Sequence, residues 1–229
     1  MILFRLIGLI FDLLFLPLRL LRRVRAVAPG AFVTITVDGP VADIVPKPRF
    51  WELRRQHATS LHAVSELADL AIVDPRVRGL LVTLKSLSTG MAGATSLRAI
   101  LARVRAAGKE VVVHMPMGGG TKEVYVASAA SKVYLGPATQ LAPLGFLHAS
   151  RYLRRALDKA GLEPEVFACG EYKSAGENLV RDSMSDAQRE QLGGLLDRLH
   201  AALVDGIAQG RGMTADEARA VVDGAPYFG

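Results

Sequence analysis

The sequence predicts an α/β fold with a mostly parallel sheet. Two observations lead to this prediction. Short apolar runs alternate with segments in which apolar residues recur at helical spacing, and glycine or proline residues separate most of them. Half of the 229 residues are hydrophobic and 22% are charged, which is typical of a folded globular chain. Strands that alternate with helices favour parallel βαβ units, because each helix returns the chain across one face of the sheet.

In the first half of the chain, each expected element has its own signal. Residues 31–41 alternate between apolar and polar side chains like a strand, which is expected to end in a turn at Asp38-Gly39. Residues 59–72 show helical periodicity, and Asp74-Pro75 is expected to stop that helix. Residues 77–87 are nearly all apolar, as expected of a buried parallel strand.

The second half continues the alternation. The expected elements are a helix over about 95–107 closed by Gly108, a strand over 110–115, a helix over about 121–130, a strand over 132–136, a helix over about 148–160 closed by Gly161, a strand over 163–168, a long helix to about 208 and a short last helix. The last two helices begin with capping-box patterns at Ser185–Gln188 and Thr214–Glu217. The chain then stops at two aromatic residues, so we expect the α/β domain over 30–229 to be truncated at its C-terminus.

Residues 1–28 are expected to form a membrane-anchoring or interfacial helix. A spanning helix needs about 20 apolar residues, but Asp12 interrupts this run and Pro17 would kink it. On a helical wheel, one glycine and most of the charged residues fall within one narrow arc, which favours a helix lying in the interface with arginines toward anionic headgroups. These residues are Arg5, Gly8, Asp12, Arg19, Arg22 and Arg23. Membrane lipid is therefore the expected partner of residues 1–25. An amphipathic helix packed on its own domain or on another subunit stays an alternative.

The distribution of charge and of metal-binding residues excludes several classes of protein. The net charge is +6, but residues 1–25 carry +4 of it, and no basic stripe interleaved with aromatics follows, so we expect no nucleic-acid partner. The single cysteine, Cys169, excludes an internal disulfide and a cysteine-based zinc site. The five histidines are scattered without metal-ligand spacing, so we expect no metal site.

Lys173 is the first candidate for a catalytic side chain. It lies among small residues in the stretch CGEYKSAGENLVRDSMSDAQRE at 169–190, where Ser174 is a candidate hydrogen-bond partner. A lysine acts as a general base at neutral pH only when desolvation or a nearby cation lowers its pKa from about 10.4 toward about 7–8. From residue types alone, an exposed surface lysine is the better interpretation.

The second candidate is the glycine segment that contains Gly119 and Gly120. Glycines between an apolar strand and a helix place backbone N–H groups at a helix N-terminus, which favours an oxyanion or phosphate cradle. A flexible tight turn explains the same residues equally well. Thr121 is expected to be the N-cap of the helix that follows, and a nucleophilic role for its hydroxyl is the minority interpretation.

Two stretches of the chain resemble signal peptide peptidase A. They are GEYKSAGENLVRDSMSDAQRE at 170–190 and YVASAASKVYLGPATQLAPLGFL at 125–147. The resemblance covers roughly residues 30–229. It implies a membrane-bound bacterial serine peptidase with a Ser-Lys dyad and a crotonase-like (ClpP-like) fold of repeated ββα/βαβ units. It also implies that Lys173 is the general base, and it reverses the interpretation from residue types alone.

The nucleophile is the point at which this chain departs from the family. Single-domain members carry their serine in the loop before the helix that begins YxASAA, and Thr121 holds that place here. In double-length members the N-terminal half supplies the lysine and the C-terminal half supplies the serine. The resemblance therefore implies a lysine half, whose serine comes from a missing half or a partner chain, and a reaction that needs no cofactor.

The expected function is membrane-associated cleavage of hydrophobic peptides, such as residual signal peptides, by a homo- or hetero-oligomer. We expect the bacterial cytoplasmic membrane as its location. The arginines after the hydrophobic segment indicate a domain in the cytoplasm, whereas the family places it on the other side, so the side stays open. The alternatives are a non-catalytic scaffold or regulatory subunit of the same fold and a crotonase-type acyl-CoA enzyme.

Overall fold

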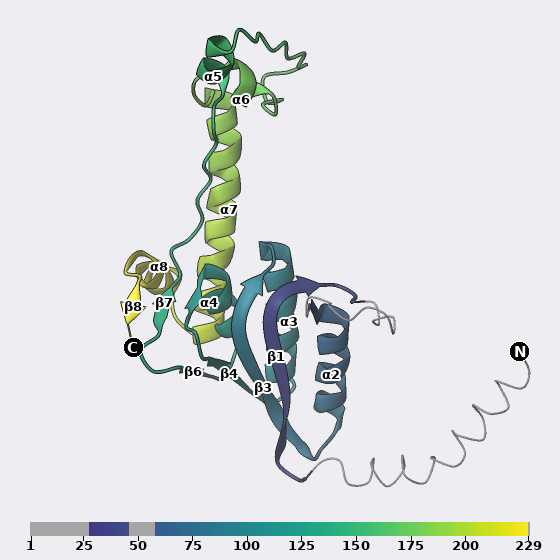
Figure 1. The fold of residues 1–229 in the computed structure, drawn as a ribbon. Helices are drawn as coiled ribbons and strands as arrows, with labels where there is room; N and C mark the ends of the chain where they lie inside the picture. The colour runs from purple at the N-terminus through teal and green to yellow at the C-terminus, as the bar shows by residue number, and fades with distance from the viewer. Residues whose placement is uncertain (1–27, 46–57, 229) are drawn as a thin grey trace, which may run out of the picture. The chain divides into compact units, whose positions relative to one another are not determined.

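The computed structural model describes residues 28–45 and 58–228 (Figure 1). The expected helix over 1–28 therefore lies outside the described residues, apart from residue 28. The chain divides into two compact units, which we describe separately. Unit 1 comprises residues 1–117 and 130–137, and unit 2 comprises residues 118–129 and 138–229.

Unit 1 is built on a five-stranded sheet in which every paired strand is parallel to its neighbour. The spatial order is β2-β1-β3-β4-β6. The strands are β1 (Ala31–Ala42), β2 (Thr59–Ser60), β3 (Val77–Ser88), β4 (Glu110–Met115) and β6 (Lys132–Leu135), and the helices are α2 (Leu61–Val73) and α3 (Met91–Ala106). The predicted α/β class and mostly parallel sheet are thus confirmed.

The core of unit 1 follows the apolar runs of the sequence. Leu80, Val82 and Leu84 of β3 are buried, as are Val111 and Val113 of β4. Helix α3 covers the sheet with an apolar stripe that consists of Ala94, Leu97, Leu101 and Val104. The predicted elements at 59–72, 77–87 and 110–115 are confirmed. Their apolar residues recur in the sequence at the same spacing as the buried residues in the structure.

Unit 2 is mainly helical and carries a small three-stranded sheet. Strand β5 pairs in parallel with β7, and β7 pairs antiparallel with β8. The elements are β5 (Gly119–Gly120), α4 (Thr121–Ala127), β7 (Gln140–Ala142), α5 (Arg154–Lys159), α6 (Glu177–Val180), α7 (Asp186–Arg211), α8 (Ala215–Asp223) and β8 (Tyr227–Phe228).

The long helix α7 begins at the predicted cap and ends at Arg211, beyond the expected end at about 208. The Ser185 hydroxyl accepts a hydrogen bond from the Gln188 N–H, and Gly212 follows the last turn with a φ of 68°. The cap of α8 is also confirmed, with Thr214 and Glu217 bonding each other's backbone N–H groups. Gly210, inside α7, lies against α4: a Cβ there would overlap the carbonyl oxygen of Ser128.

Three predictions about secondary structure were wrong: a turn, the length of a helix and the presence of a strand. Asp38-Gly39 is not a turn, because β1 takes up a register shift after Val37 and continues to Ala42. The helix expected over 148–160 is limited to α5, and residues 163–168 form no strand. The physical reason is the lack of a pairing neighbour: the side chain of Phe167 is almost fully exposed, and apolar composition alone does not make a strand.

Two other helices differ from their predictions only at their ends. Helix α3 begins at Met91, before the expected start at about 95, and α4 ends at Ala127, before the expected end at about 130. Within the described ranges, the structure contains no helix of sufficient length and apolar character to cross a membrane.

We expect Gly210→Ala to destabilise the protein by about 1–3 kcal/mol, because the added methyl group overlaps the backbone of Ser128. In the same helix, nothing lies within 4 Å of a Cβ added at Gly193 or Gly194. Gly193→Ala should therefore stabilise the protein by about 0.5–1 kcal/mol through helix propensity. Thermal unfolding followed by circular dichroism gives both changes, and shifts of the same sign for the two variants would contradict the assigned contact.

We expect Asp74 to contribute stability that is lost in acid. The side chain of Arg76 bonds its carboxylate, with Nη2 at 2.8 Å from Oδ2, and this lowers the pKa of Asp74 from 3.8 to about 2. A carboxylate with a lowered pKa stabilises the folded state above its unfolded pKa, and the contribution disappears as the pH falls from about 4 to about 2.

The difference in urea midpoint between the wild type and Asp74→Asn should therefore be constant from pH 7 to 5 and shrink below pH 4. A difference that stays the same down to pH 2 would show that the ion pair with Arg76 does not carry this effect.

Candidate functional site

Lys173 closes a tight turn in unit 2. Its backbone N–H donates to the Gly170 carbonyl at 3.2 Å. Gly170 has a φ of 94°, in the left-handed region that favours glycine, so the turn explains why a glycine stands three residues before the lysine. The Lys173 side chain is exposed, in agreement with the interpretation from residue types alone.

Hydrogen bonds on both sides of Lys173 hold the turn against the N-terminal part of α7. The Tyr172 hydroxyl donates to the Glu190 carboxylate at 3.1 Å, and this bond raises the pKa of Tyr172. On the other side, Glu177 accepts from the Ser185 hydroxyl at 2.7 Å and from the Ser185 N–H at 3.3 Å. The lysine thus projects from a turn that is hydrogen-bonded to the long helix α7.

A polar hollow of about 280 Å³ lies beside this turn, and Ser174 lines it. The other lining residues are His148, Ser150, Arg151, Ala175, Asn178, Gln188, Gln191 and Leu192. Within the hollow, His148 Nε2 lies 2.8 Å from the Ser150 hydroxyl, so an imidazole and a hydroxyl are in hydrogen-bond contact. Ser150 was not among the residues predicted from the sequence, and its only signal there is its position two residues after His148.

The glycine segment makes a different local structure. Gly118 has a φ of 71°, and a Cβ there would overlap the Gln140 carbonyl, so the close pairing of β5 with β7 requires glycine. The Gly120 N–H donates to the Glu123 carboxylate at 3.1 Å. In this structure, one amide of the predicted cradle is therefore occupied by a side chain of the same chain.

Thr121 is not the N-cap that the sequence predicted. Gly120 occupies the cap position, and Thr121 is the first residue of α4. The Thr121 hydroxyl instead donates to the Gly145 carbonyl at 3.0 Å. The reason is that Glu123 folds back to the Gly120 N–H, which leaves the threonine side chain available to bond the loop after β7.

The candidate residues form two groups at different places on α7. Lys173 and Ser174 lie near Glu190, whereas Gly119, Gly120 and Thr121 precede α4, which contacts α7 through Ser128 and Gly206. At about 1.5 Å per residue, Glu190 and Gly206 are about 24 Å apart along the helix axis. The structure therefore does not bring Thr121 within reach of Lys173.

The described residues contain no group of three histidine, cysteine or acidic side chains placed to hold a metal ion.

Comparisons with known proteins agree on one family. The model of peptidase family S49 matches residues 103–229. Serine protease SPPA, chloroplastic, of Arabidopsis thaliana is 28% identical over 201 residues, which cover 88% of this chain and 29% of that protein. Protease 4 of Salmonella typhi is 32% identical over 111 residues, which cover 47% of this chain and 18% of that protein. Protease 4 of Haemophilus influenzae is 22% identical over 191 residues, 80% of this chain and 31% of that protein.

Among solved structures, an enoyl-CoA hydratase/isomerase family protein from Silicibacter pomeroyi matches with a TM-score of 0.30 and 14% identity, over 70% of this chain and 83% of that chain.

This chain spans less than a third of the length of each of the three curated relatives. The family model covers more than half of the chain and includes both the glycine segment and the lysine turn. This chain therefore belongs to peptidase family S49.

Proposed function

We propose that this chain is the lysine-bearing part of a membrane-associated serine peptidase that cleaves hydrophobic peptides. In this proposal, Lys173 is the general base of a Ser-Lys dyad. The serine comes from another segment or another chain. The proposal rests on membership of a peptidase family and on similarity to proteins named serine protease SPPA and Protease 4.

The observation that carries the proposal is the exposed position of Lys173 on a fixed turn. Tyr172 and Glu177 hold the turn on α7, so the lysine can be presented repeatedly in one orientation. Because the side chain is exposed, a hydroxyl from outside this part of the chain can approach it. A general base must come within about 3 Å of the hydroxyl proton that it removes.

The position of Thr121 supports a nucleophile from elsewhere. Its hydroxyl already donates to the Gly145 carbonyl, and it begins α4, which contacts α7 at Gly206, about 24 Å along the helix axis from Glu190 beside the lysine turn. This separation supports a dyad whose serine lies outside the described residues. A serine-bearing partner segment is consistent with relatives that are more than three times as long as the matched part.

Membrane association through residues 1–25 is part of the proposal, and the support for it is the apolar and arginine-rich composition of that segment. Assembly into a homo- or hetero-oligomer is part of it as well, and it is required where the serine lies on another chain.

A non-catalytic scaffold of the same family is the second candidate. The hydrogen bond of Thr121 favours it. This residue holds the place where single-domain relatives carry their serine, and its hydroxyl already donates to the Gly145 carbonyl. The acyl-CoA alternative receives less support, because the Gly120 N–H that it would use for an oxyanion donates to Glu123.

We expect the protein purified intact from its own cells to cleave apolar peptides and to lose about 10²–10⁴-fold in kcat in the variant Lys173→Ala, the range that general-base catalysis contributes. Lys173→Arg should be equally inactive, because a guanidinium does not lose its proton. Lys159→Ala, at an exposed lysine of α5, is the matched control and should retain activity. Full activity of Lys173→Ala, with its fold intact by circular dichroism, would overturn the assignment of Lys173 as general base, whereas a wild-type protein that cleaves no peptide would support the scaffold.

The source of the serine can be tested by labelling the same preparation with a fluorophosphonate and determining the mass of the labelled polypeptide. We expect the label on a serine outside residues 1–229, either in a longer polypeptide or in a partner chain. Label within these residues that Thr121→Ala abolishes would overturn the division of the dyad between two segments.

A further inference from the structure

The amino ends of the strands of unit 1 form one continuous end of its sheet, because the strands are parallel. The described chain begins at this end. The Gly30 N–H donates to the Arg76 carbonyl at 2.9 Å, and Ala31 pairs with Val77. Residues 1–27 are therefore joined to unit 1 at this end of the sheet.

Cations cover the carboxylates at this end. The Glu110 carboxylate is bonded by Lys132 at 2.8 Å and by Arg78 at 3.1 Å, and Asp74 is bonded by Arg76 at 2.8 Å. The three cationic side chains are 48–62% exposed, whereas the two carboxylates are 19% and 23% exposed. Solvent therefore meets mainly positive charge, although each cation has a partner.

Two further cations leave this end with an excess of positive charge. Lys109 Nζ bonds the carbonyls of Asp74 and Val77, at 2.8 and 2.6 Å, and Arg105 bonds the carbonyl of Ala130. We call these seven side chains the amino-end face. They are Arg76, Arg78, Arg105, Lys109 and Lys132 with Asp74 and Glu110, and their formal net charge is +3.

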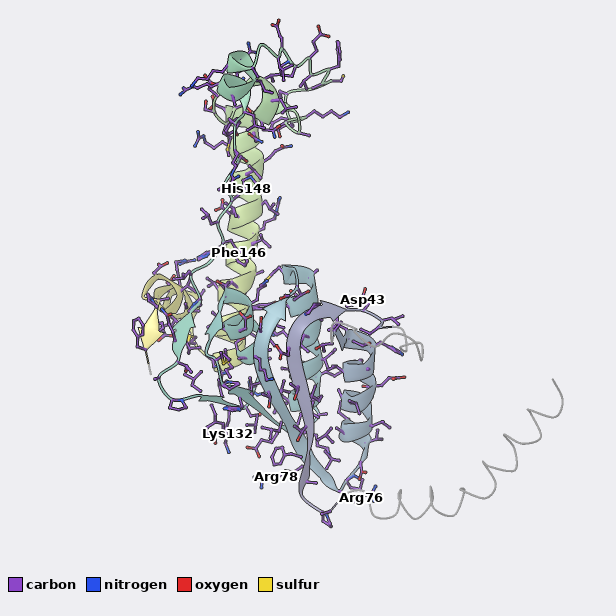
Figure 2. All side chains as sticks on the ribbon, in the orientation of Figure 1. Asp43, Arg76, Arg78, Lys132, Phe146 and His148 are labelled. Carbon is purple, nitrogen blue, oxygen red and sulfur yellow. The ribbon has the colours of Figure 1, made fainter. Side chains whose placement is uncertain are left out.

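The opposite end of the same sheet has the other sign. On β1, on β3 and directly after β1, the charged residues toward that end are Asp38, Asp43 and Lys85, with a net charge of −1, and Lys85 pairs with Asp38. Figure 2 shows Arg76, Arg78 and Lys132 at one end of unit 1 and Asp43 at the other.

Exposed aliphatic side chains border the amino-end face. Val73, the last residue of α2, is 76% exposed, and Leu70 is also exposed. Together with Val33 and Val77 they line a hollow of about 450 Å³ between α2 and β1, and Asp74 of the amino-end face is part of the same lining. Cations beside exposed aliphatic groups are typical of surfaces that lie in the interface of an anionic bilayer.

We propose that the amino-end face lies against the anionic headgroups of a membrane, with Val73 and Leu70 turned toward the hydrocarbon boundary. This inference rests on the membrane association in the proposed function. Charge complementarity supports it, and so does the attachment of the apolar residues 1–27 at the same end. A nucleic acid is the less favoured partner, because its bases stack on aromatic side chains, whereas the exposed groups here are mainly aliphatic.

The contact can be tested with an environment-sensitive fluorophore on the full chain. In a Cys169→Ser background, Val73→Cys and Lys85→Cys place one label at each end of the sheet. With vesicles of phosphatidylglycerol and phosphatidylcholine, we expect a blue shift and quenching by lipid-borne quenchers at position 73 but not at position 85. Equal responses at both positions, or none at position 73 on protein that floats with the vesicles, would overturn the proposal.

Charge variants test the same surface in both directions. One charge near an anionic surface contributes about 1 kcal/mol, or about fivefold in binding. Glu110→Gln should therefore bind these vesicles about fivefold more tightly and Lys132→Gln about fivefold more weakly. The control Lys85→Gln should be unchanged, and all four proteins should be alike on pure phosphatidylcholine. A gain in Glu110→Gln that is limited to the anionic vesicles cannot come from apolar surface exposed by misfolding, and a gain or loss equal to that of the control would contradict the assignment.

The outcomes separate this proposal from the proposed function. If the wild-type chain does not float with any vesicle, membrane association itself fails. If it floats while the label at position 73 stays in water, only the assignment of the amino-end face to the membrane contact fails. A response of position 73 to single-stranded RNA but not to the anionic vesicles would assign the face to nucleic acid instead. Peptide cleavage by the intact protein is measured independently of all three results.

Discussion

The contact of Ser128 with α7 is the constraint on which the arrangement of unit 2 depends. The buried Ser128 hydroxyl lies 2.7 Å from the carbonyl oxygen of Tyr125 and 3.1 Å from that of Gly206, and Arg211 donates to the carbonyl of Ala127 at 2.7 Å. Glycine at position 210 lets the two backbones approach. Because α4 follows the glycine segment directly, this contact fixes the segment on one part of α7, while the lysine turn is bonded to another.

The fold of unit 1 could be predicted largely from the sequence, because its elements bury faces that the sequence marks by periodicity. The run that forms β3 is apolar at the positions that the structure buries, and Ser60, Ser185 and Thr214 cap helices through bonds to residues three positions ahead. The errors occurred where a tertiary neighbour decides the outcome. Residues 163–168 have the composition of a strand but no strand beside them, and Glu123 rather than Thr121 determines how α4 begins.

The candidate site was less predictable, for a physical reason. Residue types and spacing favoured a surface position for Lys173, and the structure places it on the surface. Its proposed role came from the resemblance of a long stretch to one family, since catalysis depends on a group that approaches in three dimensions. Likewise, the contact between His148 and Ser150 depends on the path of the loop before α5, and neither periodicity nor a motif describes that path.

The exposure of Lys173 also indicates how the proposed peptidase would be kept inactive before assembly. A lysine becomes a general base at neutral pH when it is removed from water or placed beside another cation. The described chain leaves this side chain exposed and supplies a turn hydrogen-bonded to α7 and a polar hollow beside it. In the proposed function, the surface that brings the serine would also cover the lysine, so that the nucleophile and the desolvation of its base arrive in one step. A lysine half that needs both from the same surface has little means of cleaving peptides on its own.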